Sequence, residues 1–163
     1  MHTPEEEFYV FLRFADADMS QAQIALDHLV KVEGDFLRLC LLKDAAISYC
    51  RPFKKSHGIF NKTLRLDESY IPVHLKDLHT ELINLRDQVF AHTDIGVRSP
   101  ILHCWTHEPK RIFPIQFKSH SYLQLLGQEQ EMRLLFNAVL DLIRDKQAKL
   151  EAQFGKAPPP GRQ

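Results

Sequence analysis

The chain has 163 residues, of which 44% are hydrophobic and 26% are charged, and its 21 Lys and Arg residues balance 21 Asp and Glu residues. These values are ordinary for one globular domain that buries its core without disulfides or a structural metal. They exclude a global basic field, so any binding of nucleic acid has to come from a local patch.

The three cysteines and the N-terminus bear on the cellular compartment. Cys40, Cys50 and Cys104 have no C-x-x-C spacing, and we interpret them as buried free thiols of a reducing cytosol. Residues 1–7 are acidic and have no apolar signal core, and no apolar run approaches the length of a membrane span. The sequence therefore predicts a cytoplasmic protein with no membrane partner.

Capping residues divide the first part of the chain into three expected helices. Thr3, followed by Pro4 and three acidic residues, is typical of a helix start, and Ser20 and Asp35 are expected to cap two further helices. Arg51-Pro52 limits the third helix, because a residue before proline avoids helical geometry. Apolar residues on several faces predict that the first half of this third helix is buried almost all round. The expected helices span roughly residues 4–14, 20–32 and 35–51.

An apolar seam predicts a fourth helix, which Pro72 begins. Two short apolar runs on either side of Glu108-Pro109-Lys110 predict a small exposed hairpin or ordered loop packed by Trp105. A last helix is expected over about residues 121–154, before a Pro-rich tail, 155–163, that is expected to be disordered. The residues of the seam are Leu75, Leu78, Leu82, Leu85 and Val89.

The whole pattern predicts an all-α fold, a four- to five-helix bundle with a small β-hairpin or loop insertion before the last helix. The sequence has no internal repeat and no domain boundary, so residues 1–154 are expected to form a single helical domain. Polar residues that interrupt this apolar pattern are the natural candidates for a functional site.

The run Arg86 to His92 closes the fourth helix and contains a polar, cationic pair, Arg86 and His92, on a helix otherwise typical of core. On a wheel at ~100° per residue, Arg86 and His92 fall on opposite borders of the apolar seam, and Asp87 faces away. His92 lies in the final turn, where the partial negative charge of the helix favours imidazolium. In a structural interpretation, Arg86 lies along the core and His92 is a favourable C-terminal residue. In a functional one, both side chains emerge at the rim of one groove.

The run Leu85 to Asp94, LRDQVFAHTD, resembles the motif of the HEPN superfamily of helical-bundle domains. The family pattern is an arginine, usually followed by a polar residue, and a histidine a short distance further on. Here Arg86 and His92 match with five residues between them, and Asp87 occupies the polar position. The segment 49–53, YCRPF, is also similar to bacterial members of the superfamily, and the likeness in architecture covers roughly residues 20–153.

This resemblance implies a metal-independent endoribonuclease of the toxin or phage-defence type. In that chemistry a base takes the proton of a ribose 2′-hydroxyl, the oxygen attacks the adjacent phosphorus, and a cation stabilises the phosphorane before a 2′,3′-cyclic phosphate forms. The resemblance assigns His92 as base or acid, Arg86 as the phosphate-binding cation, and Asp87 as a residue that orients them. It implies no cofactor and no metal. The implied partners are an RNA substrate, an antitoxin and a second copy of the chain in a homodimer.

A competing hypothesis is a non-catalytic dimeric helical protein, an interaction or sensor module, in which the same residues organise an interface. The two hypotheses differ in what surrounds Arg86 and His92. A catalytic pair has to be accessible to solvent, whereas a structural pair is expected to lie against carboxylates such as Asp44, Asp87 or Asp94.

Other groups of chemically active residues are less favoured. His103 and His107 flank Cys104 and Trp105, but on a strand they lie roughly 13 Å apart, which is too far for one zinc ion. Cys50 adjoins Arg51, yet a buried thiol is favoured over a reactive thiolate there. Basic loop residues form an RNA-binding patch only if their loops converge in the fold: Lys54, Lys55, Lys62, Arg65, Lys110, Arg111 and Lys118.

Overall fold

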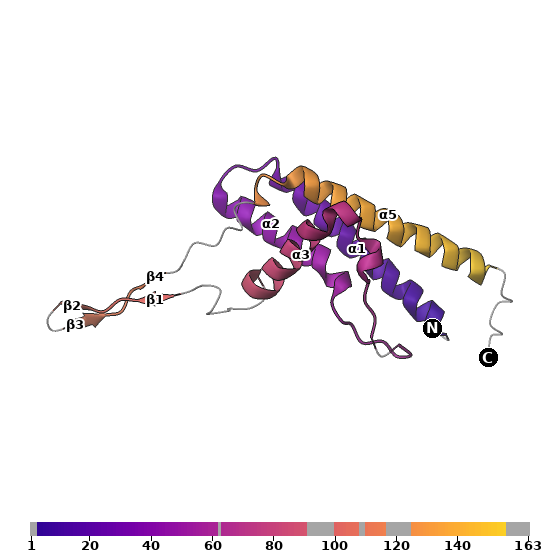
Figure 1. Ribbon diagram of the computed structural model, residues 1–163, viewed down its shortest axis with the longest axis horizontal. Coiled ribbons are helices and arrows are strands. Elements are labelled where there is room, and N and C mark those ends of the chain that lie inside the picture. Colours follow the sequence, from indigo (N-terminus) through magenta and orange to yellow (C-terminus); the bar gives the residue numbers. More distant parts are fainter. Residues whose placement is uncertain (1–2, 62, 91–99, 108–109, 117–124, 156–163) are drawn as a thin grey trace.

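The helical class predicted from the sequence is confirmed by a computed structural model, which describes residues 3–61, 63–90, 100–107, 110–116 and 125–155. Within these ranges a fifth α-helix is not seen. The α-helices are α1 (Pro4–Leu29), α2 (Asp35–Cys50), α3 (Lys76–Leu85) and α5 (Glu129–Phe154). Figure 1 shows α1 and α5 as two long helices side by side, with α2 packed along α1 and α3 at an angle to them.

The first helix is longer than the sequence predicted. Thr3 caps it as expected, because its hydroxyl accepts a hydrogen bond from the backbone N–H of Glu6 at 3.1 Å and the Glu6 carboxylate accepts one from the N–H of Thr3. Ser20, however, is not a cap. It lies inside α1, where its hydroxyl donates to the carboxylate of Asp16 one turn earlier. The expected break between two helices is therefore wrong, because one continuous apolar face runs along α1. Its buried apolar residues are Phe11, Leu12, Ala15, Met19, Ala22, Ala25, Leu26 and Leu29.

The start of α2 is more exposed than the sequence predicted. Gly34, which precedes it, has φ +93°, a conformation that glycine adopts at little cost. Phe36 and Leu37 are 75% and 52% exposed, and Cys40 is exposed as well. The prediction that the first half of α2 is buried all round is therefore wrong. The predictions that Cys40 and Cys104 are buried are also wrong, because both are exposed. All three cysteines are free, and Cys50 alone is buried. The sequence shows which residues are apolar but not which of them another element covers.

The segment between α2 and α3 follows the expected punctuation. The helix α2 ends at Cys50, close to the predicted limit, but Arg51 keeps helical backbone angles (φ −53°, ψ −50°) and begins the 3₁₀ turn Arg51–Phe53. The expectation that the residue before Pro52 avoids helical geometry is therefore wrong. Two further 3₁₀ turns, Glu68–Tyr70 and Val73–Leu75, lead into α3. The predicted seam packs inward, with Leu75, Leu78 and Leu82 buried in the core of this same chain. At Arg86 the α-helix gives way to a π-helical turn, Arg86–Phe90.

The predicted hairpin before the last helix is confirmed. Strand β1 (Ile101–Leu102) pairs with β4 (Ile115–Gln116), and β2 (Trp105–His107) pairs with β3 (Lys110–Ile112), both antiparallel. In Figure 1 these strands project away from the helices. Trp105 is 63% exposed and does not pack the hairpin into a core. The exposed large apolar side chains of this segment are Ile101, Leu102, Trp105, Ile112, Phe113 and Ile115.

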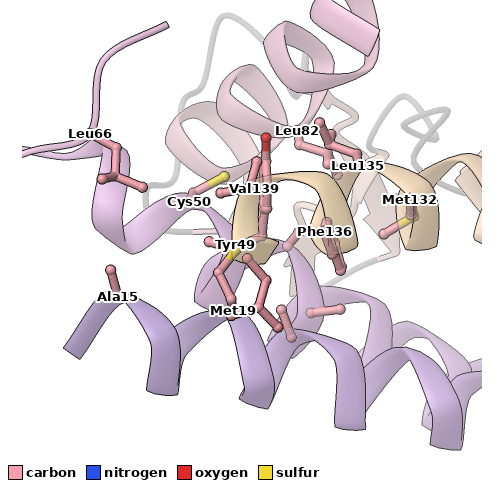
Figure 2. Close-up of a cluster of buried hydrophobic side chains, with 14 of the residues drawn as sticks. Ala15, Met19, Tyr49, Cys50, Leu66, Leu82, Met132, Leu135, Phe136 and Val139 are labelled. Carbon is pink, nitrogen blue, oxygen red and sulfur yellow. The ribbon is translucent and has the colours of Figure 1, made fainter. Parts of the chain in front are cut away.

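The buried core lies where the four helices meet. The helices α1 and α5 run antiparallel, since the Tyr9 hydroxyl donates to the Glu151 carboxylate at 2.6 Å and Gln23 donates to Asn137 near their other ends. Figure 2 shows Tyr49 of α2 beside Phe136 of α5, and the two rings stack with their centroids 4.7 Å apart. None of the described helices has the length and apolar character that crossing a membrane requires.

A buried carboxylate ties the loop after α2 to the first turn of α1. Glu7 is only 4% exposed, and its side chain accepts hydrogen bonds from the backbone N–H groups of Ile59, Phe60 and Asn61. Burial raises the pKa of Glu7, but the hydrogen bonds from Asn61, Ile59 and Phe60 outweigh it and hold the pKa below its usual value. Gly58 leaves room for this contact, because a Cβ there would lie 2.5 Å from Oε2 of Glu7.

Replacing Glu7 with glutamine is expected to lower the midpoint of thermal unfolding by several degrees at neutral pH, because the amide cannot accept the same set of N–H donors. Since the folded-state pKa of Glu7 is depressed, its stabilising contribution is present above about pH 4.3 and is lost as the pH falls further. The variant should therefore lose less stability than wild type on acidification. Glu5→Gln, an exposed change in the same turn, is the control for thermal melts across that pH range. Equal melting temperatures for the two variants would contradict the assignment.

Candidate functional site

The structure describes two of the three predicted site residues. Arg86 ends α3 and begins the π-helical turn, and Asp87 follows it. His92 lies outside the described residues, as does Asp94, so the distance between Arg86 and His92 stays untested. Single π-helical turns are frequently found at functional sites, which favours this end of α3 as a candidate site.

Arg86, Asp87 and Lys54 form a cluster that we call the Asp87 cluster. Nη1 of Arg86 donates to Oδ1 of Asp87 at 2.8 Å, and Nζ of Lys54 donates to Oδ2 at 2.5 Å. The side chains of Lys54, Asp87 and Arg86 are 31%, 39% and 27% exposed. Two cations against one carboxylate leave one net positive charge at a partly accessible surface.

The position of Asp87 corrects the helical-wheel prediction. The wheel placed Asp87 facing away from the apolar seam, whereas its carboxylate binds Lys54 of the segment after α2. A wheel gives the direction of a side chain around one helix axis but carries no information about neighbouring segments. The prediction that Asp87 orients Arg86 agrees with the hydrogen bond between them, but its effect on catalysis is untested.

Buried apolar surroundings lie next to the Asp87 cluster. Cys50, the last residue of α2, is fully buried, and burial raises the pKa of its thiol to about 12, although the charges of Lys54 and Arg86 oppose this. Cys50 is therefore a neutral thiol and no nucleophile. Burial also raises the pKa of Asp87, but the hydrogen bonds and charges of Lys54 and Arg86 outweigh it, so the pKa lies below its usual value and the carboxylate is ionised.

A second polar pair, Tyr49 and His79, lies close to Lys54 and was not predicted from the sequence. The Tyr49 hydroxyl and Nδ1 of His79 are 2.7 Å apart, and the Phe53 ring packs against the imidazole with centroids 4.7 Å apart. Burial raises the pKa of Tyr49, so the phenol stays protonated, and the tautomer of His79 sets which of the two groups donates. Burial, together with the charges of Lys54 and Lys76, lowers the pKa of His79. His79 is half-buried between the rings of Tyr49 and Phe53, so we interpret it as a structural histidine.

The surroundings of Arg86 combine features of both hypotheses. Arg86 pairs with a carboxylate, as the structural interpretation requires, yet about a quarter of its side chain is exposed, as the catalytic one requires. Its buried Nε has no hydrogen-bond acceptor among the residues that the structure describes. Asp44 plays no part here, because it accepts a hydrogen bond from Gln21.

Other parts of the described chain offer less chemistry. A hollow of about 450 Å³ is lined by residues that include Phe8, Arg65, Tyr70 and Lys146, and none of them belongs to the Asp87 cluster. Within the described ranges, no three His, Cys, Asp or Glu side chains are arranged to hold a metal ion. His103 lies 3.2 Å from the Gln116 amide oxygen across the hairpin, and the side chain of His107 is outside the description.

Comparisons with known proteins add no family. No protein-family model, curated protein or solved structure matches this chain. The HEPN resemblance therefore rests on the sequence motif, and the geometry of the Asp87 cluster is the structural evidence that bears on function.

Proposed function

We propose that this protein is a metal-independent endoribonuclease of the HEPN type, in which Arg86 binds the scissile phosphodiester and His92 transfers protons. The observation that carries the proposal is the surplus positive charge of the Asp87 cluster, partly exposed at the end of α3. Both cations keep part of their side chains exposed, so they are accessible to an anionic ligand such as a phosphodiester. A toxin or phage-defence role, with an antitoxin partner, belongs to the same proposal.

The proposed reaction needs few groups. His92 takes the proton of the 2′-hydroxyl, and the oxygen forms a bond to the adjacent phosphorus. The planar guanidinium of Arg86, held by Asp87, binds two oxygens of the phosphorane and offsets its added charge. The bond from phosphorus to the 5′-oxygen then breaks, and that oxygen takes a proton from the imidazolium form of His92. The products are a 2′,3′-cyclic phosphate and a free 5′-hydroxyl.

The test is incubation of purified protein with a mixed-sequence RNA in EDTA, with the chemistry of the new ends determined by mass spectrometry. Wild type is expected to produce 2′,3′-cyclic phosphate ends, and His92→Ala to lose roughly a hundredfold or more of that activity. His74→Ala, an exposed histidine just before α3, is the matched control and should keep it. RNA methylated at every 2′-oxygen should stay intact, because it lacks the attacking group.

Intact RNA with every variant folded would count against the nuclease and favour the second candidate, a dimeric interaction module. The exposed apolar hairpin favours this candidate, since a two-stranded hairpin is marginally stable alone and large exposed apolar patches mark binding surfaces. The apolar seam of α3 offers no dimer interface through Leu75, Leu78 and Leu82, because these three residues are buried within one chain. A monomeric mass in light scattering would count against either form of the homodimer.

A further inference from the structure

The segment after α2 brings to Arg86 a cation that the sequence motif does not contain. Pro52 and the 3₁₀ turn Arg51–Phe53 fix the direction in which the chain leaves α2, and Lys54 is the first residue beyond that turn. Phe53 is anchored in turn by its ring contacts with Tyr49 and His79. Lys54 is therefore held beside α3 by the core and not by its ion pair alone.

The geometry of the shared carboxylate sets the spacing of the two cations. Lys54 binds Oδ2 of Asp87 and Arg86 binds Oδ1, so one carboxylate and two hydrogen bonds separate the nitrogens. Two non-bridging oxygens of a phosphodiester span a width comparable to that of a carboxylate. Each cation uses one N–H on Asp87, and both keep further donors on side chains that are partly exposed.

We propose that Lys54 is a second phosphodiester-binding residue of this site, and that Asp87 is the positioning residue that holds Lys54 and Arg86 at the spacing of a phosphate. This inference rests on the proposed function, because it takes RNA as the ligand. Lys54 binds the RNA backbone as a point charge, and Arg86 binds the same or the adjacent phosphate through its planar fork. The buried Cys50 and its apolar surroundings exclude water from one side of the cluster, which strengthens both interactions.

The first experiment measures binding separately from cleavage. A short fluorescein-labelled RNA, methylated at every 2′-oxygen so that it cannot be cleaved, is titrated with the full-length protein at several salt concentrations. Lys54→Gln is expected to weaken binding roughly tenfold, the loss of one charge-assisted hydrogen bond. It should also reduce the slope of log affinity against log salt by about 0.7, the value for one phosphate contact on a single strand. Lys54→Arg, which keeps the charge, should restore most of the affinity.

The matched control is Lys55→Gln, which removes the same charge one residue further along from an exposed position. Equal effects of Lys54→Gln and Lys55→Gln on affinity and salt slope would overturn the inference, and so would a wild type that does not bind the RNA. Because Lys54→Gln loses a packed ion pair, wild-type protein provides an independent readout. Bound RNA should protect Lys54, but not Lys55, from acylation by an amine-reactive reagent, and absence of that difference would also overturn the inference. RNA that binds through Lys54 but is never cleaved in its unmethylated form would leave this inference standing while the proposed nuclease fails.

Discussion

Replacing Arg86 with alanine is expected to lower kcat/KM for RNA cleavage by roughly a thousandfold, and replacing it with lysine by roughly a hundredfold. Alanine removes the cation that offsets the charge of the phosphorane. Lysine keeps that charge but loses the planar fork that binds two phosphate oxygens at once. The side chain of Arg86 is also fixed in the free protein by its 2.8 Å hydrogen bond to Asp87, and this preorganisation is lost with a flexible ammonium group. Cleavage of a defined RNA at substrate concentrations above and below KM measures both effects.

The control for this series is Arg51→Lys. Arg51 follows α2, is more exposed than Arg86, and forms an ion pair with Asp18 of α1. It should change activity by no more than about twofold, because a surface pair of this kind contributes little to stability or positioning. Full activity of Arg86→Lys would contradict binding through a fork, and full activity of Arg86→Ala would remove Arg86 from the reaction altogether. In either case, circular dichroism has to show that the variant is folded.

Replacing Tyr49 with alanine is expected to destabilise the protein by about 3–5 kcal/mol, the range for deleting a fully buried aromatic ring. Tyr49 is 0% exposed, and its ring stacks on Phe136 of α5 and contacts Phe53 beyond α2. It therefore joins α2 to α5, and through His79 it also joins α2 to α3. Because no neighbouring backbone segment can move in without breaking other contacts, most of the cavity should persist. Urea unfolding followed by circular dichroism measures the loss.

Tyr49→Phe separates the ring from the hydroxyl. It keeps the stacking but leaves Nδ1 of His79 without its hydrogen-bond partner, so we expect a loss of about 1–2 kcal/mol. Tyr49→Ala and Tyr49→Phe are each other's control, because they alter the same position and differ in whether the ring is kept. A loss in Tyr49→Phe as large as in Tyr49→Ala would show that the hydrogen bond, and not the ring, joins the helices. No loss in Tyr49→Phe would show that the hydrogen bond between the Tyr49 hydroxyl and His79 contributes no net stability.

Local sequence rules predicted those parts of the fold that depend on residues close together in the chain. Thr3 and Glu6 form the expected capping box, Pro52 ends α2, and the two apolar runs pair as a hairpin. The same rules were wrong about Ser20, which has the chemistry of a cap and lies inside a helix. A capping residue ends or starts a helix only where the apolar face also stops, and α1 has an apolar face on both sides of Ser20.

The sequence by itself determined the helical class, the hairpin and the candidate motif, because periodicity, caps and turns act over a few residues. Only the tertiary structure decided that Lys54 binds Asp87, that Tyr49 and His79 share a hydrogen bond, and that the start of α2 is exposed. The first two contacts join residues separated by 33 and 30 positions in the chain, and no local pattern records which distant segments will meet. The cation cluster at the centre of the proposed function is a contact of this kind. Packing of the core around Tyr49 brings Lys54 next to Arg86 and Asp87. The sequence motif contains Arg86 and Asp87 but not Lys54.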